Sequence, residues 1–209
     1  TNNGTMAIYG ATILNLAFGL AILTQIVLFI HVRWRDDRLY LVGQRLALGV
    51  STLVTLATVT LIALLVKGAF EVDYVAHYTS KGTPLLYKFA ALWAGQSGSL
   101  LFWLLILSLY SAVVIFQNQR KRSDIMPYVI AVLIGVQLFF LFMVNYSTNP
   151  FNPVNADFIP SDGLGLNPLL QNVTMAIHPP TLYMGYVGFT VPFAFAIAAL
   201  VVRRVDTVW

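Results

Sequence analysis

The residue best suited to chemistry in this sequence is His178, which is followed at once by Pro179 and Pro180. A neutral imidazole is a ready ligand for iron, zinc or copper. Two prolines fix two φ angles, remove two backbone donors and bias the preceding residue away from helix. The sequence therefore predicts an imidazole on a stiff, extended backbone just above the first turn of a helix. One histidine is not a metal site, so ligation and an ordinary hydrogen-bonded histidine both remain open.

A second stretch combines aromatic, small and polar residues where a helix should enter lipid. Trp93 and Trp103 flank the segment GQSGS at residues 95–99, which contains Gln96. Small residues let helix backbones approach closely, and polar side chains there can bond across helices. The stretch is either an interfacial helix start with aromatic anchors or one wall of a site for a flat, apolar ligand.

The remaining candidate groups exclude several kinds of chemistry. His31 ends an apolar run beside arginines, which favours an interfacial role, and His77 lies in a polar connection, which favours a solvated side chain. The absence of cysteine excludes disulfides, thiolate metal sites and cysteine nucleophiles. There is no Ser-His-Asp arrangement, phosphate-binding loop or dinucleotide fingerprint, and no carboxylate pair is placed for acid–base work.

The composition identifies the elements that must position these residues. The sequence is 58% hydrophobic and 10% charged, whereas a soluble domain has about 25% charged residues. Apolar runs that are long enough to cross a bilayer must be helices, because only helices or closed barrels satisfy the backbone in lipid. We therefore expect an all-α, polytopic membrane helix bundle that forms a single module over residues 1–209, with spans at residues 7–32, 46–66, 99–116, 127–146 and 180–202.

The connections between these runs predict the orientation of the bundle. Arginines and lysines cluster between the first and second runs, after the third and after the fifth. The positive-inside rule then places the N-terminus outside and the C-terminus inside. It also places two longer segments outside, at residues 67–88 and 147–177. Residues 69–78 are rich in aromatic and β-branched types, which predicts a short surface strand.

Three motifs in order along the chain resemble one family. WAGQSGSLLFW at residues 93–103, STNPF at residues 147–151 and LNPLLQNVTMAIHPPTLYMGYVGFTVPFAFAIAAL at residues 166–200 are similar to the N-terminal part of the CcmF family, the haem lyase subunits of cytochrome c maturation, and to their nitrite-reductase-associated NrfE-like relatives. Ser97 stands where that family usually has an acid. The resemblance therefore implies no carboxylate function at this position of the chain.

The resemblance implies a haem-handling subunit of a cytochrome c synthase in the bacterial inner membrane, with its site on the periplasmic side. It implies that haem comes from a CcmE-like haem chaperone and passes to the CXXCH thiols of apocytochrome c, which a CcmH-like factor keeps reduced. Nucleic acid is not an expected partner. The histidine of the family's HPP motif matches His178, which would be an axial ligand of the haem iron. The other candidates are expected to line the haem pocket or to support it: Pro179, Trp93, Gln96, Trp103, Tyr183 and Tyr186.

The family's tryptophan-rich WWD motif and its further histidines do not occur in this sequence. We therefore expect the haem site to be completed by a C-terminal WWD-containing half or chain. A second hypothesis is a structural scaffold subunit that docks partners through residues 95–99 and the outer loop without binding haem. A solute or lipid transporter is disfavoured by the lack of charge within the spans and of inverted repeats.

Overall fold

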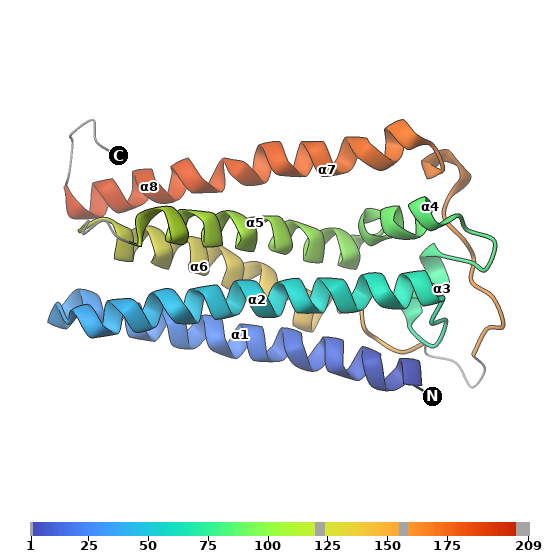
Figure 1. Cartoon of the computed structure of the whole chain (residues 1–209), viewed down its shortest axis with the longest axis horizontal. Helices are drawn as coiled ribbons and strands as arrows, with labels where there is room; N and C mark the ends of the chain where they lie inside the picture. The colour runs from blue at the N-terminus through green and yellow to red at the C-terminus, as the bar shows by residue number, and fades with distance from the viewer. Residues whose placement is uncertain (1, 120–123, 155–158, 204–209) are drawn as a thin grey trace.

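The computed structural model describes residues 2–119, 124–154 and 159–203. Its helices pack side by side along one common direction (Figure 1). Five of its helical stretches are long and apolar enough to cross a membrane, so the predicted all-α bundle with five spans is confirmed. In chain order the elements are α1 (Asn2–Trp34), α2 (Asp37–Lys67), α3 (Asp73–Tyr78), α4 (Leu85–Ala90), the 3-10 turn η1 (Ala91–Trp93), α5 (Gln96–Asn118), α6 (Met126–Phe142), the π-helical turn η2 (Met143–Ser147), the 3-10 turn η3 (Pro168–Leu170), α7 (Val173–Gly188) and α8 (Thr190–Val202).

The first two spans form a hairpin with a very short turn. Only Arg35 and Asp36 separate α1 from α2. The Asp36 carboxylate accepts a hydrogen bond of 2.8 Å from the Arg38 backbone N–H and so caps α2. Helix α2 therefore begins well before the predicted residue 46, and Arg38 and Arg45 lie on the helix rather than in a connection. Arg120, Lys121, Arg122 and Arg204, on which the orientation also depends, lie outside the described residues.

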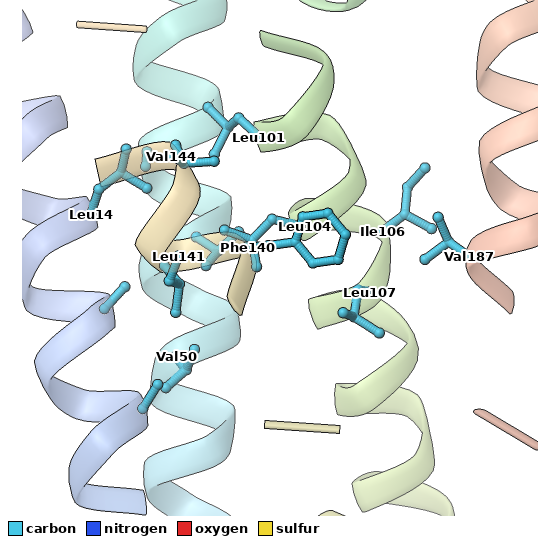
Figure 2. Close-up of a cluster of buried hydrophobic side chains, with 14 of the residues drawn as sticks. Leu14, Val50, Leu101, Leu104, Ile106, Leu107, Phe140, Leu141, Val144 and Val187 are labelled. Carbon is cyan, nitrogen blue, oxygen red and sulfur yellow. The ribbon is translucent and has the colours of Figure 1, made fainter. Parts of the chain in front are cut away.

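Helix α6 is the most enclosed span and α7–α8 the least. In the most apolar window of each span, 50% of the residues are buried for α6 and only 22% for α7–α8. Side chains from several helices meet α6, among them Leu14 of α1 and Leu104 of α5, while Ile106 of α5 faces Val187 of α7 (Figure 2). Lipid tails are as apolar as leucine, so close packing rather than exclusion of water stabilises such contacts.

Polar side chains inside the bundle bind neighbouring helices. In lipid such hydrogen bonds hold helices together because the alternative is an unsatisfied group in hydrocarbon. Gln25 Nε2 of α1 donates to Ala131 O of α6 at 2.6 Å. Ser51 Oγ of α2 donates to Ser108 O of α5 at 2.9 Å. Gln137 Nε2 of α6 donates to Ser111 Oγ of α5 at 2.9 Å.

Both long connections lie at the end of the bundle that also holds the N-terminus, which we call the loop end (Figure 1). The predicted surface strand is wrong, because residues 73–78 form helix α3 instead. Asp73 in the first turn and His77 in the last complement the helix dipole. In the described residues the only β pairing is one antiparallel bridge between Val72 and Pro153.

The second long connection is fastened to α3 and the residues that follow it. The Leu164 N–H donates to Ala76 O at 2.8 Å, and the Asp162 carboxylate accepts from the Lys81 N–H at 2.8 Å. The part of this connection from residue 159 onward is therefore fastened at the loop end just before α7 begins.

Candidate functional site

The structure places His178 inside a helix, so the predicted extended backbone is wrong. Helix α7 begins at Val173, and the Asn172 side chain caps it by accepting from the Thr174 N–H at 2.9 Å. His178 therefore lies in the second turn of α7, and Pro179 and Pro180 follow within the helix. The cap at Asn172 starts the helix before the proline pair, so the local bias of the prolines does not decide the backbone of His178.

The proline pair still changes the helix locally. Pro179 and Pro180 carry no N–H, so the carbonyls of Met175 and Ala176 receive no donor from the next turn. The Thr181 hydroxyl lies against the same turn and donates to His178 O at 2.8 Å. This bond supplies a donor to the carbonyl of His178, which lies just after the two carbonyls that the prolines leave without an N–H. The backbone of His178 is thus held by proline and threonine together.

The imidazole of His178 is exposed. Its ring nitrogens have no hydrogen bond or ion pair within the part of the chain that the structure describes. Those residues also contain no group of three or more His, Cys, Asp and Glu side chains that could hold a metal ion. The ring can therefore supply one ligand to an external metal centre, and further ligands must come from elsewhere.

Four of the predicted site residues meet in one aromatic cluster between α5 and α7. The ring centroid of Trp103 lies 4.8 Å from that of Tyr186 and 5.9 Å from that of Tyr183. Phe102 bridges Tyr183, at 5.4 Å, to Trp93, at 5.2 Å. Edge-on and tilted contacts of this kind each contribute about 0.5–1.5 kcal/mol beyond area burial. The cluster therefore fixes the rotation of α7 against α5.

His178 does not point into this cluster. Pro179, Tyr183 and Tyr186 recur at helical spacing and are half-buried, which defines the face of α7 that packs on α5. Each helical residue is rotated by about 100° from the one before it. His178 therefore lies on a different face of α7 from Pro179, and that face is exposed.

Pro179 and Trp93 do line one cavity together, but it is small. Its volume is about 40 Å³, and Leu166 and Met175 are among its other walls. Pockets for organic ligands typically measure about 300–1,000 Å³. The aromatic residues therefore pack on the α5-facing side of α7 and do not enclose a flat ligand.

Gln96 opens onto a separate groove. A cavity of about 370 Å³ at the loop end is lined by Gln96 and Ser97 together with Tyr78, His77 and Asp73. The His77 Nδ1 atom lies 3.3 Å from an Asp73 carboxylate oxygen. The structure thus groups Gln96 with α3, not with the rings on α7.

The glycines near Gln96 admit tyrosine rings of α3. A Cβ atom at Gly98 would collide with the Tyr74 hydroxyl and with Leu92 O, and one at Gly95 would collide with the ring of Tyr78. Within α3 the rings of Tyr74 and Tyr78 lie 4.6 Å apart. These small residues are therefore covered by the chain itself, which removes them as the docking face expected in the scaffold hypothesis.

Tyr74 is the central residue of this junction. Its single O–H hydrogen is shared between Ala91 O at 2.8 Å and Leu92 O at 3.1 Å, and its oxygen accepts from the Gly95 N–H at 3.1 Å. Burial raises the pKa of the Tyr74 phenol well above its ordinary value, so the hydroxyl keeps its proton. Tyr74 therefore holds the start of α5 in place.

Comparison with known proteins identifies the family. The profile of the family described as "Cytochrome C assembly protein" matches residues 93–207, which is more than half of the chain. The chain belongs to this family. Among its relatives are the cytochrome c-type biogenesis proteins CycK of Bradyrhizobium diazoefficiens and CcmF of Escherichia coli, each 38% identical, over 93% and 96% of this chain. The solved structure of "Cytochrome c Heme Lyase CcmF" superposes with a TM-score of 0.79 at 27% identity over 97% of this chain.

These comparisons confirm the predicted resemblance to CcmF and its relatives, and a place in cytochrome c biogenesis. They also support a multi-pass membrane protein. The chain spans only about a third of its relatives, covering 29% of the CycK sequence, 31% of the E. coli CcmF sequence and 31% of the solved chain.

Sequence reasoning missed three aromatic residues that organise the site. Phe102 links Trp93 to Tyr183, Phe140 lies 4.8 Å from Trp103, and Tyr74 fixes the start of α5. The first two are ordinary members of apolar runs and carry no separate signal. Tyr74 could have been inferred from the small residues at positions 95 and 98, which leave room for a large partner.

Proposed function

We propose that this chain is the haem-handling part of a cytochrome c synthase and that His178 is an axial ligand of the haem iron during transfer to apocytochrome c. The observation that carries the proposal is the exposed imidazole, without a partner in the described chain, on the uncovered face of α7 near the loop end. Neutral imidazole is the usual proximal ligand of haem iron.

Haem is the cargo in this proposal, and the chain contributes one ligand and its positioning. The aromatic cluster of Trp103, Tyr183 and Tyr186 prevents rotation of α7. The Tyr110 hydroxyl, which donates to Met184 O at 2.9 Å, adds a polar contact between α5 and α7. His178 is thereby kept on the open face. Trp93 and Pro179 support the same helix, and we assign Gln96 no part in haem binding.

We further propose that the loop end faces the periplasm across the bacterial inner membrane. The N-terminus and both long connections lie at that end, whereas Arg33, Arg38 and Arg203 lie at the other. Positive residues favour the cytoplasmic side. This orientation exposes His178 to a periplasmic haem chaperone, to apocytochrome c and to its thiol-reducing factor. The second haem ligand then comes from a WWD-containing segment or partner.

The test compares haem loading of the intact protein in wild type, His178→Ala and His77→Ala. His77 is a matched control because it is also an exposed histidine at the loop end, near Asp73 and apart from α7. We expect His178→Ala alone to change the Soret band of copurified haem and to reduce the yield of mature cytochrome c. An unchanged spectrum and full maturation in His178→Ala would reject the assignment.

The second candidate function is a scaffold that binds no haem through this chain. It is favoured by the long exposed apolar face of α7–α8, which includes Leu182, Phe189 and Phe193. In that case His178→Ala would be tolerated, whereas charged substitutions of Leu182 or Phe189 would separate the chain from its partners in pull-down experiments.

A further inference from the structure

A cavity of about 310 Å³ lined by both charged and apolar residues lies at the end of the bundle opposite the loop end, where α1 ends and α2 and α6 begin. Helix α2 has 31 residues and is therefore about 46 Å long, which exceeds the roughly 30 Å of the hydrocarbon core. Trp34, which is 70% exposed, ends α1 at the same level and is the type of residue that marks the membrane interface. The cavity thus lies at the depth of lipid head groups.

One side of the cavity carries hydrogen-bond donors. Arg35 follows α1 in the left-handed region with a φ of 58°, and its backbone N–H donates to His31 O at 2.7 Å. The Tyr40 hydroxyl accepts from Gln44 Nε2 at 2.8 Å, so its own hydrogen is free to donate. The Arg35 guanidinium and this phenol suit the oxygens of a phosphate.

His31 contacts Asp36 and Tyr40 beside these donors. Its Nδ1 atom lies 2.8 Å from Asp36 O, and because a carbonyl only accepts, Nδ1 carries the proton. Its ring packs on Tyr40 with centroids 5.4 Å apart. This contact fixes the Tyr40 ring, so the phenol donor is positioned before any ligand arrives.

The cavity also carries negative charge. Asp124 lies just before α6 and Asp37 in the first turn of α2, and both line the cavity with Arg35. Neither Arg35 nor Asp124 forms an ion pair within the described ranges. Arg35 and Asp124 therefore border one space without an ion pair between them, which suits a ligand that carries both a phosphate and an ammonium group.

We propose that this cavity binds the head group of an aminophospholipid, with the phosphate on Arg35 and Tyr40 and the primary ammonium on Asp124. A purely anionic lipid would offer no group to the Asp124 carboxylate and would be repelled by it. The quaternary ammonium of phosphatidylcholine has no N–H to donate to Asp124. A free phosphate would leave the apolar walls, Val32 and Pro127, uncovered, whereas a lipid places its glycerol and chains there.

The experiment measures lipid binding by the intact protein in detergent micelles, using phosphatidylethanolamine, phosphatidylcholine and inorganic phosphate as probes. Native mass spectrometry and the shift in melting temperature both report binding. We expect phosphatidylethanolamine to bind at least about fivefold more tightly than phosphatidylcholine. Arg35→Gln should weaken its binding about tenfold, equivalent to about 1.4 kcal/mol. Arg33→Gln is the control, because it removes the same charge in the same region but does not line the cavity.

Asp124→Asn tests the ammonium side separately. It should reduce the preference for phosphatidylethanolamine over phosphatidylcholine to about one while phosphate-dependent binding remains. Tyr40→Phe keeps the ring that packs on His31 and should weaken both lipids equally. Equal binding of the two lipids by wild type, equal loss in Arg33→Gln and Arg35→Gln, or full competition by millimolar inorganic phosphate would each overturn the proposal.

Discussion

The junction between α3 and α5 offers a sharp test of how the loop end is held together. Tyr74→Phe removes one hydroxyl that serves three backbone groups and leaves the ring in place. Ala91 O keeps a second donor, the Ala94 N–H at 3.2 Å. Leu92 O loses only the longer branch of the shared hydrogen, at 3.1 Å. The main loss is the buried N–H of Gly95, which has no other acceptor among the hydrogen bonds of the described chain. Leaving such a group unpaired costs about 1–3 kcal/mol.

We expect Tyr74→Phe to lower the free energy of local opening at the start of α5 by about 2 kcal/mol, which corresponds to about 30-fold faster exchange of the Gly95 amide. Amide hydrogen exchange with mass spectrometry measures this in the intact protein. Tyr78→Phe is the matched control, because its ring stacks on Tyr74 but its hydroxyl makes no hydrogen bond within the described residues. Unchanged protection of Gly95 in Tyr74→Phe would refute the reasoning.

Three other predictions concern the packing of the bundle and the loop end. Gly98→Ala should reduce the amount of folded protein in the membrane severely, because the new Cβ meets the backbone at Leu92 O, whereas Gly82→Ala, where the space is open, should have no effect on the same immunoblot. Gln137→Met should change the melting temperature little, because the loss of the hydrogen bond from Gln137 Nε2 to Ser111 is offset by removal of the Oε1 atom, which is buried without a partner in the described chain. A fall of many degrees would show that the bond to Ser111 outweighs the unpaired oxygen. The hydrogen bond from the Lys81 N–H holds the pKa of Asp162 below its ordinary value. This contact therefore stabilises the loop above about pH 4, and the stabilisation is lost as the pH falls through the lowered pKa. In Asp162→Asn the exchange protection of the Lys81 amide should no longer depend on this titration.

The five spans were predictable because apolar runs of this length have one stable form in lipid. Their ends were not, because polar caps extend helices beyond the apolar runs. Asp36 caps α2 and Asn172 caps α7, each through one side-chain hydrogen bond. Nothing in the sequence distinguishes these two residues from the other Asp and Asn residues that do not cap a helix. The prediction of a surface strand was wrong for a related reason. Asp73 and His77 favour a short helix, whereas the β-branched and aromatic composition of the segment favours a strand.

The candidate site was predictable in its residues but not in its arrangement. Trp103, Tyr183 and Tyr186 do meet, yet the sequence could not show that His178 points elsewhere, because that depends on where α7 begins. Had the helix begun at Pro180, as predicted from the sequence, His178 would have been an extended residue above it. The cap at Asn172 makes it one helical residue among others and so assigns it to the exposed face.

The most direct test of the role of His178 is chemical rescue. His178→Gly removes the imidazole from an exposed position, so free imidazole in solution can reach a haem iron that has lost this ligand. We expect the haem spectrum of the intact His178→Gly protein to differ from wild type and to return toward it when imidazole is added, with partial recovery of cytochrome c maturation. A spectrum that neither changes in His178→Gly nor responds to imidazole would contradict axial ligation by His178.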